Sequence, residues 1–351
     1  MHFLNIKKFI GFIVIAAIVV LGFVYPLPYY IMQPGGAYEL TQFVDVENAK
    51  LDSEGTMSLM TVSMSTATPF TYAVAKISSR KELLPETQVR SPHESENDYN
   101  LRQLKLMTDS QFNAKYVAFQ KANKDYEINY NGVYVVYVLE NGASKGILKA
   151  GDKVIGIDGQ KVKRQTELID YLNGKKSGDQ VTLSIIRDKK EQTKSVTLKE
   201  IPGTESKVGI GITFTENKSI ATNPKVKIEA NDIGGPSAGL MFTLEIIDQL
   251  TEGDLTKGYN IAGTGEMLES GQVGRIGGMD KKVIAADEGD IEIFFAPDDT
   301  ISDEVKKLNP SIKTNYEIAV ETAKKIDTKM KIVPVKTVDD ALKYLNDLKQ
   351  K

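Results

Sequence analysis

A serine among small residues is the first candidate for chemistry in this sequence. Ser237 lies in the run GGPSAG at 234–239, directly before the apolar segment LMFTLEIIDQL. This pattern predicts a helix that begins close to the serine. A serine in such a turn can cap the helix, help to cradle a phosphate, or act as a nucleophile. The last use requires a second group that removes the hydroxyl proton.

The residue types in the chain restrict which group that could be. The chain has no cysteine, and its two histidines, His2 and His93, both precede Ser237. Gly235–Gly239 matches the G-x-S-x-G pattern of α/β-hydrolases, but those enzymes place a histidine after the serine, so that interpretation fails. His93 lies in the polar run SPHESEND, which predicts a solvated loop and not a catalytic or metal-binding position.

Lysine is the remaining candidate base, because burial disfavours its charged form and lowers its pKa. Lys281 and Lys282 occupy the first turn of a predicted helix that follows the glycine pair at 277–278. The positive end of the helix dipole favours a neutral amine there. The apolar run VIAA that follows predicts that one lysine points inward, and the spacing alone leaves both open.

The turn around Ser237 could also stabilise a developing negative charge. Backbone N–H groups are free at the start of a helix and can hold an oxyanion. Gly235, Pro236 and Ala238 are small and leave room for a substrate backbone. We therefore expect these residues beside the reacting carbonyl if the serine is a nucleophile. The alternative is that Ser237 only caps a packed helix.

Residues 127–202 are rich in short strands separated by glycine turns, with one helical segment, RQTELIDYLNG. This part of the chain, and LKAGDKVIGIDG in particular, resembles a PDZ domain. The resemblance implies a peptide-binding site in which Gly132 belongs to a carboxylate-binding loop, with Val133 and Val135 nearby. A purely structural module that binds nothing is the alternative.

Strands and helices alternate from 203 to 351, which predicts an α/β domain with a mixed sheet. GGPSAG, followed 45 residues after its serine by a lysine in VGRIGGMDKKVIAA, resembles the proteolytic domain of Lon proteases. The resemblance implies a Ser-Lys dyad in which Ser237 is the nucleophile and Lys282 is the base. Thr264, in GTGEM, would lie beside the dyad. Lon proteases usually carry an acid three residues before the serine, whereas the nearest acid here is Asp232, so an acidic helper stays an open question.

The N-terminal residues predict a membrane anchor. Residues 9–25, FIGFIVIAAIVVLGFVY, carry no charge, and they follow Lys7 and Lys8. This asymmetry predicts a cytoplasmic tail at 1–8, a transmembrane signal anchor at 9–25, and an extracellular location for the rest of the chain. A cleaved signal peptide is the alternative.

Two further segments separate this anchor from the PDZ-like part. The run PLPYYIMQPGGAY at 26–38 predicts a linker. A strand near 55–64 and helices over 68–84 and 97–122 are predicted within 39–126, which we expect to pack with the C-terminal domain.

Composition excludes some functions. The net charge of −3, with both signs interspersed, gives no sign of nucleic-acid binding. The chain has no G-x-x-x-x-G-K-[ST] motif, so ATP is not expected as a partner. No metal or cofactor is predicted, and the sequence does not indicate an oligomeric state.

Together these features predict an α/β (α+β) Lon-type proteolytic domain with an inserted mostly-β PDZ domain and one N-terminal transmembrane helix. The combination resembles the SepM/YlbL-type membrane-anchored, PDZ-containing Lon-like serine proteases. That resemblance implies an ATP-independent endopeptidase that cleaves extracellular or membrane-associated peptides or proteins, including secreted signalling peptides, with the PDZ domain presenting the substrate. A catalytically silent membrane-tethered PDZ scaffold is one alternative, and a phosphate-binding fold like that of small-molecule kinases is a weaker one.

Overall fold

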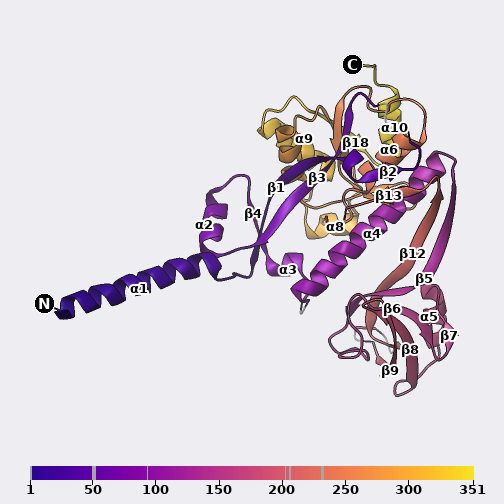
Figure 1. Cartoon of the computed structure of the whole chain (residues 1–351), viewed down its shortest axis with the longest axis horizontal. Helices are drawn as coiled ribbons and strands as arrows, with labels where there is room; N and C mark the ends of the chain where they lie inside the picture. Colours follow the sequence, from indigo (N-terminus) through magenta and orange to yellow (C-terminus); the bar gives the residue numbers. More distant parts are fainter. Residues whose placement is uncertain (1, 50–52, 93, 202, 205–206, 231–232) are drawn as a thin grey trace.

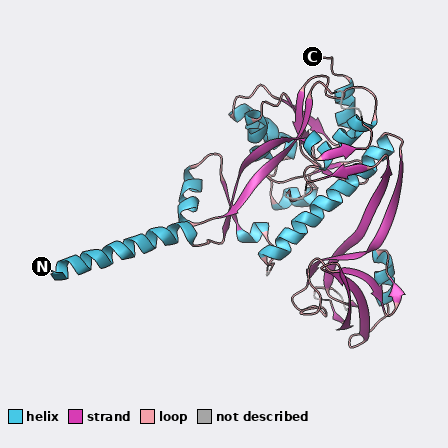
Figure 2. Cartoon of the chain, viewed as in Figure 1, coloured by secondary structure: helices cyan, strands magenta, loops and turns pink. Residues whose placement is uncertain are grey.

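The structure is a computed structural model that describes residues 2–351 except 50–52, 93, 202, 205–206 and 231–232, with side chains described from Lys8 onward. A long N-terminal helix projects from the body of the molecule in Figure 1. A strand-rich module lies at the opposite side and is joined to the body by two long strands. Figure 2 shows that helices are concentrated in the body, whereas the module is almost entirely strand.

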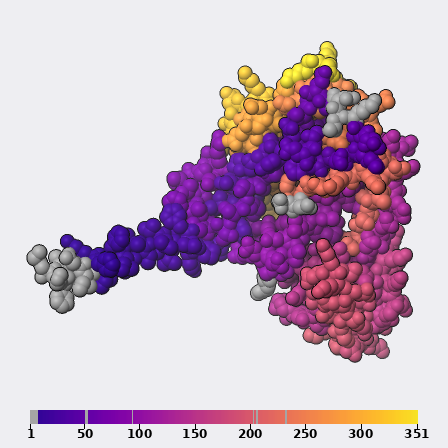
Figure 3. Space-filling model, in the orientation of Figure 1, coloured from indigo at the N-terminus to yellow at the C-terminus, as the bar shows by residue number. Residues whose placement is uncertain are grey.

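The projecting helix is α1 (His2–Val24), whose C-terminal end contacts α2 (Pro69–Ile77) through the rings of Phe23 and Phe70, 4.5 Å apart between centroids. Figure 3 shows its described residues extending away from the body. Its apolar side chains from Phe9 to Val24 are largely exposed. Among the helices in the described part of the chain, none is both long and apolar enough to cross a membrane. The transmembrane helix predicted at 9–25 is therefore not supported. The apolar run at 9–25 has 17 residues, at the short end of the length that a membrane span requires.

The main sheet combines strands from both ends of the chain. Its order is β18-β17-β14-β3-β1-β4. The strands are β1 (Tyr29–Glu39), β3 (Thr56–Thr66), β4 (Glu82–Pro85), β14 (Asn260–Gly263), β17 (Ile293–Pro297) and β18 (Lys331–Val335). β14 pairs in parallel with β3, with Gly263 opposite Leu59. The strand predicted near 55–64 is thus confirmed, and it joins the C-terminal strands in one sheet.

Two predictions in the N-terminal part are wrong. Residues 26–38 are not a linker, because β1 occupies most of them and pairs with β3 on one side and β4 on the other. The Pro and Gly residues that suggested a linker instead produce a register shift between Pro34 and Ala37. The helix predicted over 68–84 ends earlier: α2 covers Pro69–Ile77, and the following residues form β4.

Helices cover both faces of the main sheet. The alternation of strand side chains sends Phe295 to the face covered by α4, α6 and α10, and Phe294 to the face covered by α7 and α9. These helices are α4 (Glu96–Lys121), α6 (Gly239–Leu250), α7 (Met279–Glu288), α9 (Asn315–Lys325) and α10 (Val338–Asn346). The helix predicted over 97–122 is confirmed as α4. Thr337 caps α10, as its sequence predicts.

The strand-rich module has its own sheet and its own apolar core. The sheet order is β12-β5-β6-β8-β9, with β7 paired to β6. Its elements are β5 (Asp125–Val138), β6 (Lys153–Ile157), β7 (Gln160–Lys161), α5 (Gln165–Leu172), β8 (Gln180–Arg187), β9 (Lys190–Thr197) and β12 (Ile212–Asn223). β5 and β12 stay paired as far as Asp125 and Asn223. This two-stranded ribbon carries the chain into and out of the module.

Short elements complete the chain. They are η1 (Leu40–Gln42), β2 (Val44–Val46), α3 (Glu86–Val89), β10 (Lys199–Glu200), β11 (Val208–Gly209), β13 (Val226–Ile228), β15 (Glu266–Met267), β16 (Val273–Gly274) and α8 (Asp303–Leu308). β2 and β13 pair with each other, which ties the chain leaving the module to the N-terminal part.

Candidate active site

Ser237 lies in a tight turn immediately before α6. Gly235 in this turn has a φ of 85°, in the left-handed region that favours glycine. The N-cap of α6 is Ala238, and no side chain caps the helix. The interpretation of Ser237 as a helix cap is therefore wrong. Its hydroxyl is free for another contact, while its carbonyl accepts hydrogen bonds from the Gly265 N–H at 2.8 Å and the Thr264 hydroxyl at 2.9 Å.

That other contact is the amine of Lys282, which lies in the first turn of α7. Lys282 Nζ is 2.6 Å from Ser237 Oγ and 2.9 Å from Thr264 Oγ1. Only 2% of the lysine is exposed. Burial penalises the charged amine and lowers the pKa of Lys282 to about 7. A neutral amine beside a serine hydroxyl is the arrangement that proton removal requires.

The neighbouring lysine has different surroundings. Lys281 is also buried, but its Nζ is 2.5 Å from a carboxylate oxygen of Asp280 and 3.6 Å from one of Glu82. Its amine is engaged by two carboxylates and does not reach the serine. The structure thus brings Lys282, and not Lys281, to the serine.

The residues expected around the reacting carbonyl differ in whether they have a free N–H group to donate to an oxyanion. The Gly235 N–H already donates to the Gln103 carbonyl at 3.0 Å, and Pro236 has no N–H, so neither can serve as an oxyanion donor in this arrangement. The N–H groups of Ser237 and Ala238 donate no hydrogen bond to any described residue. These two groups are the available donors next to the serine hydroxyl.

A pocket of about 480 Å³ opens beside Ser237 and Lys282. Its walls are mainly apolar, and they include Tyr38, Phe43, Leu59, Met60, Val62 and Ile233. These wall residues were not predicted, and in the case of Tyr38 the reason is that β1 was taken for a linker. The apolar run YYIM ahead of the glycines is the signal that could have indicated a strand. His93 and Asp232, the two other residues considered for roles near the serine, lie outside the described residues.

The peptide-binding residues predicted in the PDZ-like module do not form an open site. The Gly132 N–H donates to the Lys163 carbonyl at 2.9 Å, and a Cβ on this glycine would lie 2.3 Å from the Val154 carbonyl oxygen. Val133 and Val135 are fully buried in the module's core. β5 is paired on both sides at Val133, so it has no free edge there.

The strands at the two ends of the module's sheet are β9 and β12. β12 is the end strand next to β5. It lies beside the start of α5, where the Gln165 N–H donates to Glu216 Oε1 at 3.4 Å. The run GVYVVYV, which contains Val133 and Val135, forms part of the interior strand β5 and not of an end strand.

Comparison with known proteins gives two matches along the chain. Residues 116–198 match the PDZ domain family, and residues 190–345 match the Lon protease (S16) C-terminal proteolytic domain. The Lon protease of Metamycoplasma arthritidis is 29% identical over 167 residues, which is 47% of this chain and 18% of that protein. A probable periplasmic serine endoprotease, DegP-like, of Pseudomonas putida is 31% identical over 109 residues, 29% of this chain and 23% of that protein.

Solved structures also resemble the module. The PDZ domain of an SdrC-like protein from Listeria innocua is 40% identical and covers 24% of this chain and 96% of that one, with a TM-score of 0.23. The chain spans less than a quarter of the length of either curated relative named above. The two family matches nevertheless cover the strand-rich module and the domain that carries Ser237. They identify the chain as one that contains a PDZ domain and a Lon-type (S16) proteolytic domain.

Proposed function

We propose that this peptidase is an ATP-independent endopeptidase in which Ser237 is the nucleophile and Lys282 is the general base. The observation that carries the proposal is the 2.6 Å distance between Lys282 Nζ and Ser237 Oγ, at an amine whose pKa is lowered to about 7. An amine with this pKa is largely neutral slightly above neutral pH, so it can take a proton without a histidine.

The reaction would proceed in two steps. Neutral Lys282 takes the proton of Ser237 as Oγ attacks the peptide carbonyl, and the protonated amine then gives that proton to the leaving nitrogen as the C–N bond breaks. In the second step Lys282 removes a proton from water as the water attacks the acyl-enzyme. The protonated amine then returns that proton to Ser237 Oγ as the ester C–O bond breaks and the new carboxyl end leaves. The N–H groups of Ser237 and Ala238 would stabilise the oxyanion in both steps.

Thr264 would keep the lysine in place between these steps. Its hydroxyl donates to the Ser237 carbonyl, so its lone pairs face Lys282 Nζ at 2.9 Å. This contact gives the amine a second polar partner besides the serine. The amine would therefore stay directed at the serine after the proton has moved.

The substrates would be peptides or unfolded segments, because the pocket is open to one side of a sheet and its walls are apolar. The PDZ domain would present them by strand addition to the free edge of β12. We further propose that α1 attaches the enzyme to a membrane and that the remaining domains face the extracellular side. The exposed apolar side chains of α1 and the lysines that precede them support this.

The catalytic proposal is tested with the full-length protein and with Ser237→Ala, Lys282→Ala and Lys281→Ala. Each is incubated with peptides from the organism's own culture medium, and cleavage is followed by mass spectrometry. We expect the first two variants to lose all cuts and Lys281→Ala to keep them. Equal cutting by all four proteins would contradict the dyad. No cutting by any of them would favour the silent scaffold.

The location is tested separately. We expect the protein to sediment with membranes and to resist extraction by alkaline carbonate, and we expect protease added to intact cells to degrade residues beyond α1. A protein that is extracted by carbonate and protected in intact cells would contradict the proposed location.

A further inference from the structure

Helix α4 contacts the catalytic turn and the PDZ domain at the same time. It is 26 residues long and lies between the body and the strand-rich module in Figure 1. Residues seven apart fall on the same side of a helix. One side of α4 carries Gln103 and Ser110, and another carries Lys105 and Phe112. These two sides have different partners.

The first side holds the turn that contains Ser237. The Gln103 carbonyl accepts the Gly235 N–H at 3.0 Å, and the hydroxyl of Ser110 donates to the Pro236 carbonyl at 2.9 Å. Ser110 is 1% exposed. The residues on both sides of the Gly235–Pro236 peptide bond, directly before the nucleophile, are thus fixed by α4. The proposed dyad depends on the position of this turn.

The second side holds strand β12 of the PDZ domain. Lys105, itself 9% exposed, forms an ion pair with Asp109 and donates to the Glu216 carbonyl at 3.4 Å. Lys218 Nζ lies 4.3 Å from the centroid of the Phe112 ring. Glu216 also accepts from the first N–H of α5, the helix next to the free edge of β12. A peptide that adds to the free edge of β12 would therefore contact the strand that carries Glu216, the residue to which Lys105 of α4 donates.

We propose that Ser110 is a positioning residue for Ser237 and that Lys105 makes this positioning depend on β12. On this proposal α4 transmits peptide binding at the PDZ domain to the catalytic turn. It rests on the proposed function of Ser237 and Lys282, and neither Ser110 nor Lys105 touches the substrate. Ser110 and Lys105 would therefore both affect Ser237 through α4, although they do not contact each other.

The test measures acylation of Ser237 directly. An N-acetylated dipeptide p-nitrophenyl ester reacts as Ser237 Oγ bonds to the acyl carbon, the ester C–O bond breaks, and p-nitrophenolate leaves in a measurable burst. We expect Ser110→Ala to slow the burst roughly tenfold, because a small displacement of a nucleophile costs that much or more. The KM and the apparent pKa near 7 should not change, since the surroundings of Lys282 are intact.

The matched control is Thr108→Ala. Thr108 is exposed on the same helix, and its hydroxyl bonds only to the Leu104 carbonyl. This variant also removes one hydroxyl from α4, and we expect wild-type acylation. Ser110→Cys, which keeps the volume and a weak donor, should be intermediate. If Ser110→Ala melts far below the wild type, the acylation rate of Ser110→Cys is compared with the wild type instead.

A double-mutant cycle tests the transmission. We expect Lys105→Met to slow acylation several-fold in the wild type but to add nothing in Ser110→Ala, because residues on one path are not additive. Lys105→Arg should restore most of the rate. Multiplicative effects of the two substitutions, or unchanged acylation in Ser110→Ala, would overturn the inference while the dyad stands. A wild type with no burst, or a burst that survives Ser237→Ala, would overturn the proposed function and the inference together.

Discussion

Lys282, the proposed general base, would serve catalysis at the expense of stability. Its amine is almost fully removed from water, and its polar contacts are two hydroxyl groups with no opposite charge. The same burial that brings its pKa to about 7 makes the protonated form costly in the folded state. Both consequences can be measured.

Activity should rise with pH as Lys282 loses its proton. Because the neutral amine is the active form, we expect the rate of acylation to increase through an apparent pKa of about 7 and then level off. The pH profile of the burst with a p-nitrophenyl ester measures this. A profile that falls on going from pH 6 to pH 8 would mean that the charged lysine is the active form.

Substitution of Lys282 should raise the free energy of unfolding although it abolishes activity. The folded pKa of Lys282 lies below the unfolded value of 10.5, so the unfolded chain binds more protons between these values and stability rises with pH there. Lys282→Met removes the cost of the buried charge. We expect the inactive variant to be more stable at pH 6 by several kcal/mol, on the order of 3. The gain should shrink towards pH 10, as measured by denaturant unfolding at both pH values.

Thr264 should affect catalysis without affecting substrate binding. Thr264→Val keeps the shape of the side chain but removes the hydroxyl between Lys282 Nζ and the Ser237 carbonyl. We expect kcat to fall by about 10- to 100-fold with little change in KM. Thr264→Ser, which keeps the hydroxyl, should retain most of the rate. A wild-type kcat in Thr264→Val would mean that the hydroxyl does not hold the amine.

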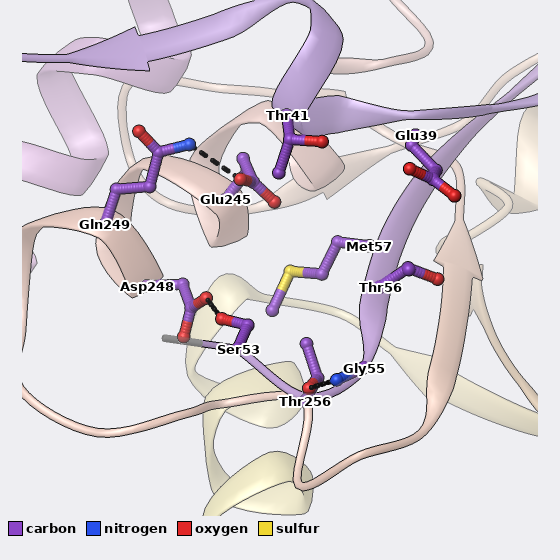
Figure 4. Close-up of a pocket in the computed structure, with 10 residues that line it drawn as sticks. All are labelled: Glu39, Thr41, Ser53, Gly55, Thr56, Met57, Glu245, Asp248, Gln249 and Thr256. Carbon is purple, nitrogen blue, oxygen red and sulfur yellow. Dashed lines mark hydrogen bonds between the residues drawn. The ribbon is translucent and has the colours of Figure 1, made fainter. Parts of the chain in front are cut away.

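At the scale of elements, α6 carries a second group of buried polar residues, at the end away from Ser237. Glu245, Asp248 and Gln249 are each less than 10% exposed. Figure 4 shows Gln249 directed at Glu245, and Asp248 at the Ser53 hydroxyl, around a small pocket of about 70 Å³. Burial raises the pKa of Glu245 to about 7, and the nearby Asp248 adds to this, although the Gln249 hydrogen bond opposes it.

Glu245 should therefore weaken the fold as the pH rises. Its folded pKa is above the unfolded value of 4.5, so the folded state holds its proton more tightly, and the stability gained at low pH is lost between about 4.5 and 7. Glu245→Gln resembles the protonated acid. We expect it to raise the melting temperature at pH 8 and to change it little at pH 4.5. A variant equally stable at both pH values relative to the wild type would mean that Glu245 ionises freely.

The elements also show what sequence alone can predict. Ser237 and the lysine pair could be found because each lies in a short motif at the start of a helix, where local residues determine the geometry. The motif left Lys281 and Lys282 both open, and the resemblance to Lon proteases favoured Lys282. β1 was taken for a linker because its pairing partner lies far away in the chain, and Pro34 looks like part of a linker until β3 is placed beside it.

At the scale of the whole molecule, the N-terminal strands are part of the catalytic domain. β3 lies between β14 and β1, and both β1 and β3 line the pocket beside Ser237. A protein that begins at residue 26 keeps β1, whereas one that begins at residue 40 lacks it. We expect the longer form to fold and the shorter one to aggregate, because it exposes an edge of β3. Light scattering and circular dichroism of the two forms would show this, and equal behaviour would mean that β1 is dispensable.

The pairing of β3 with β14 has a consequence for the newly made chain. Asn260 in β14 lies opposite Thr56 in β3, so the sheet beneath the catalytic turn joins an early segment to one synthesised some two hundred residues later. Lys282 follows later still. The amine cannot meet the serine until the segment that carries residue 282 has left the ribosome. With the proposed dyad, a growing chain that has not reached this length would be unable to cut itself or its neighbours during synthesis.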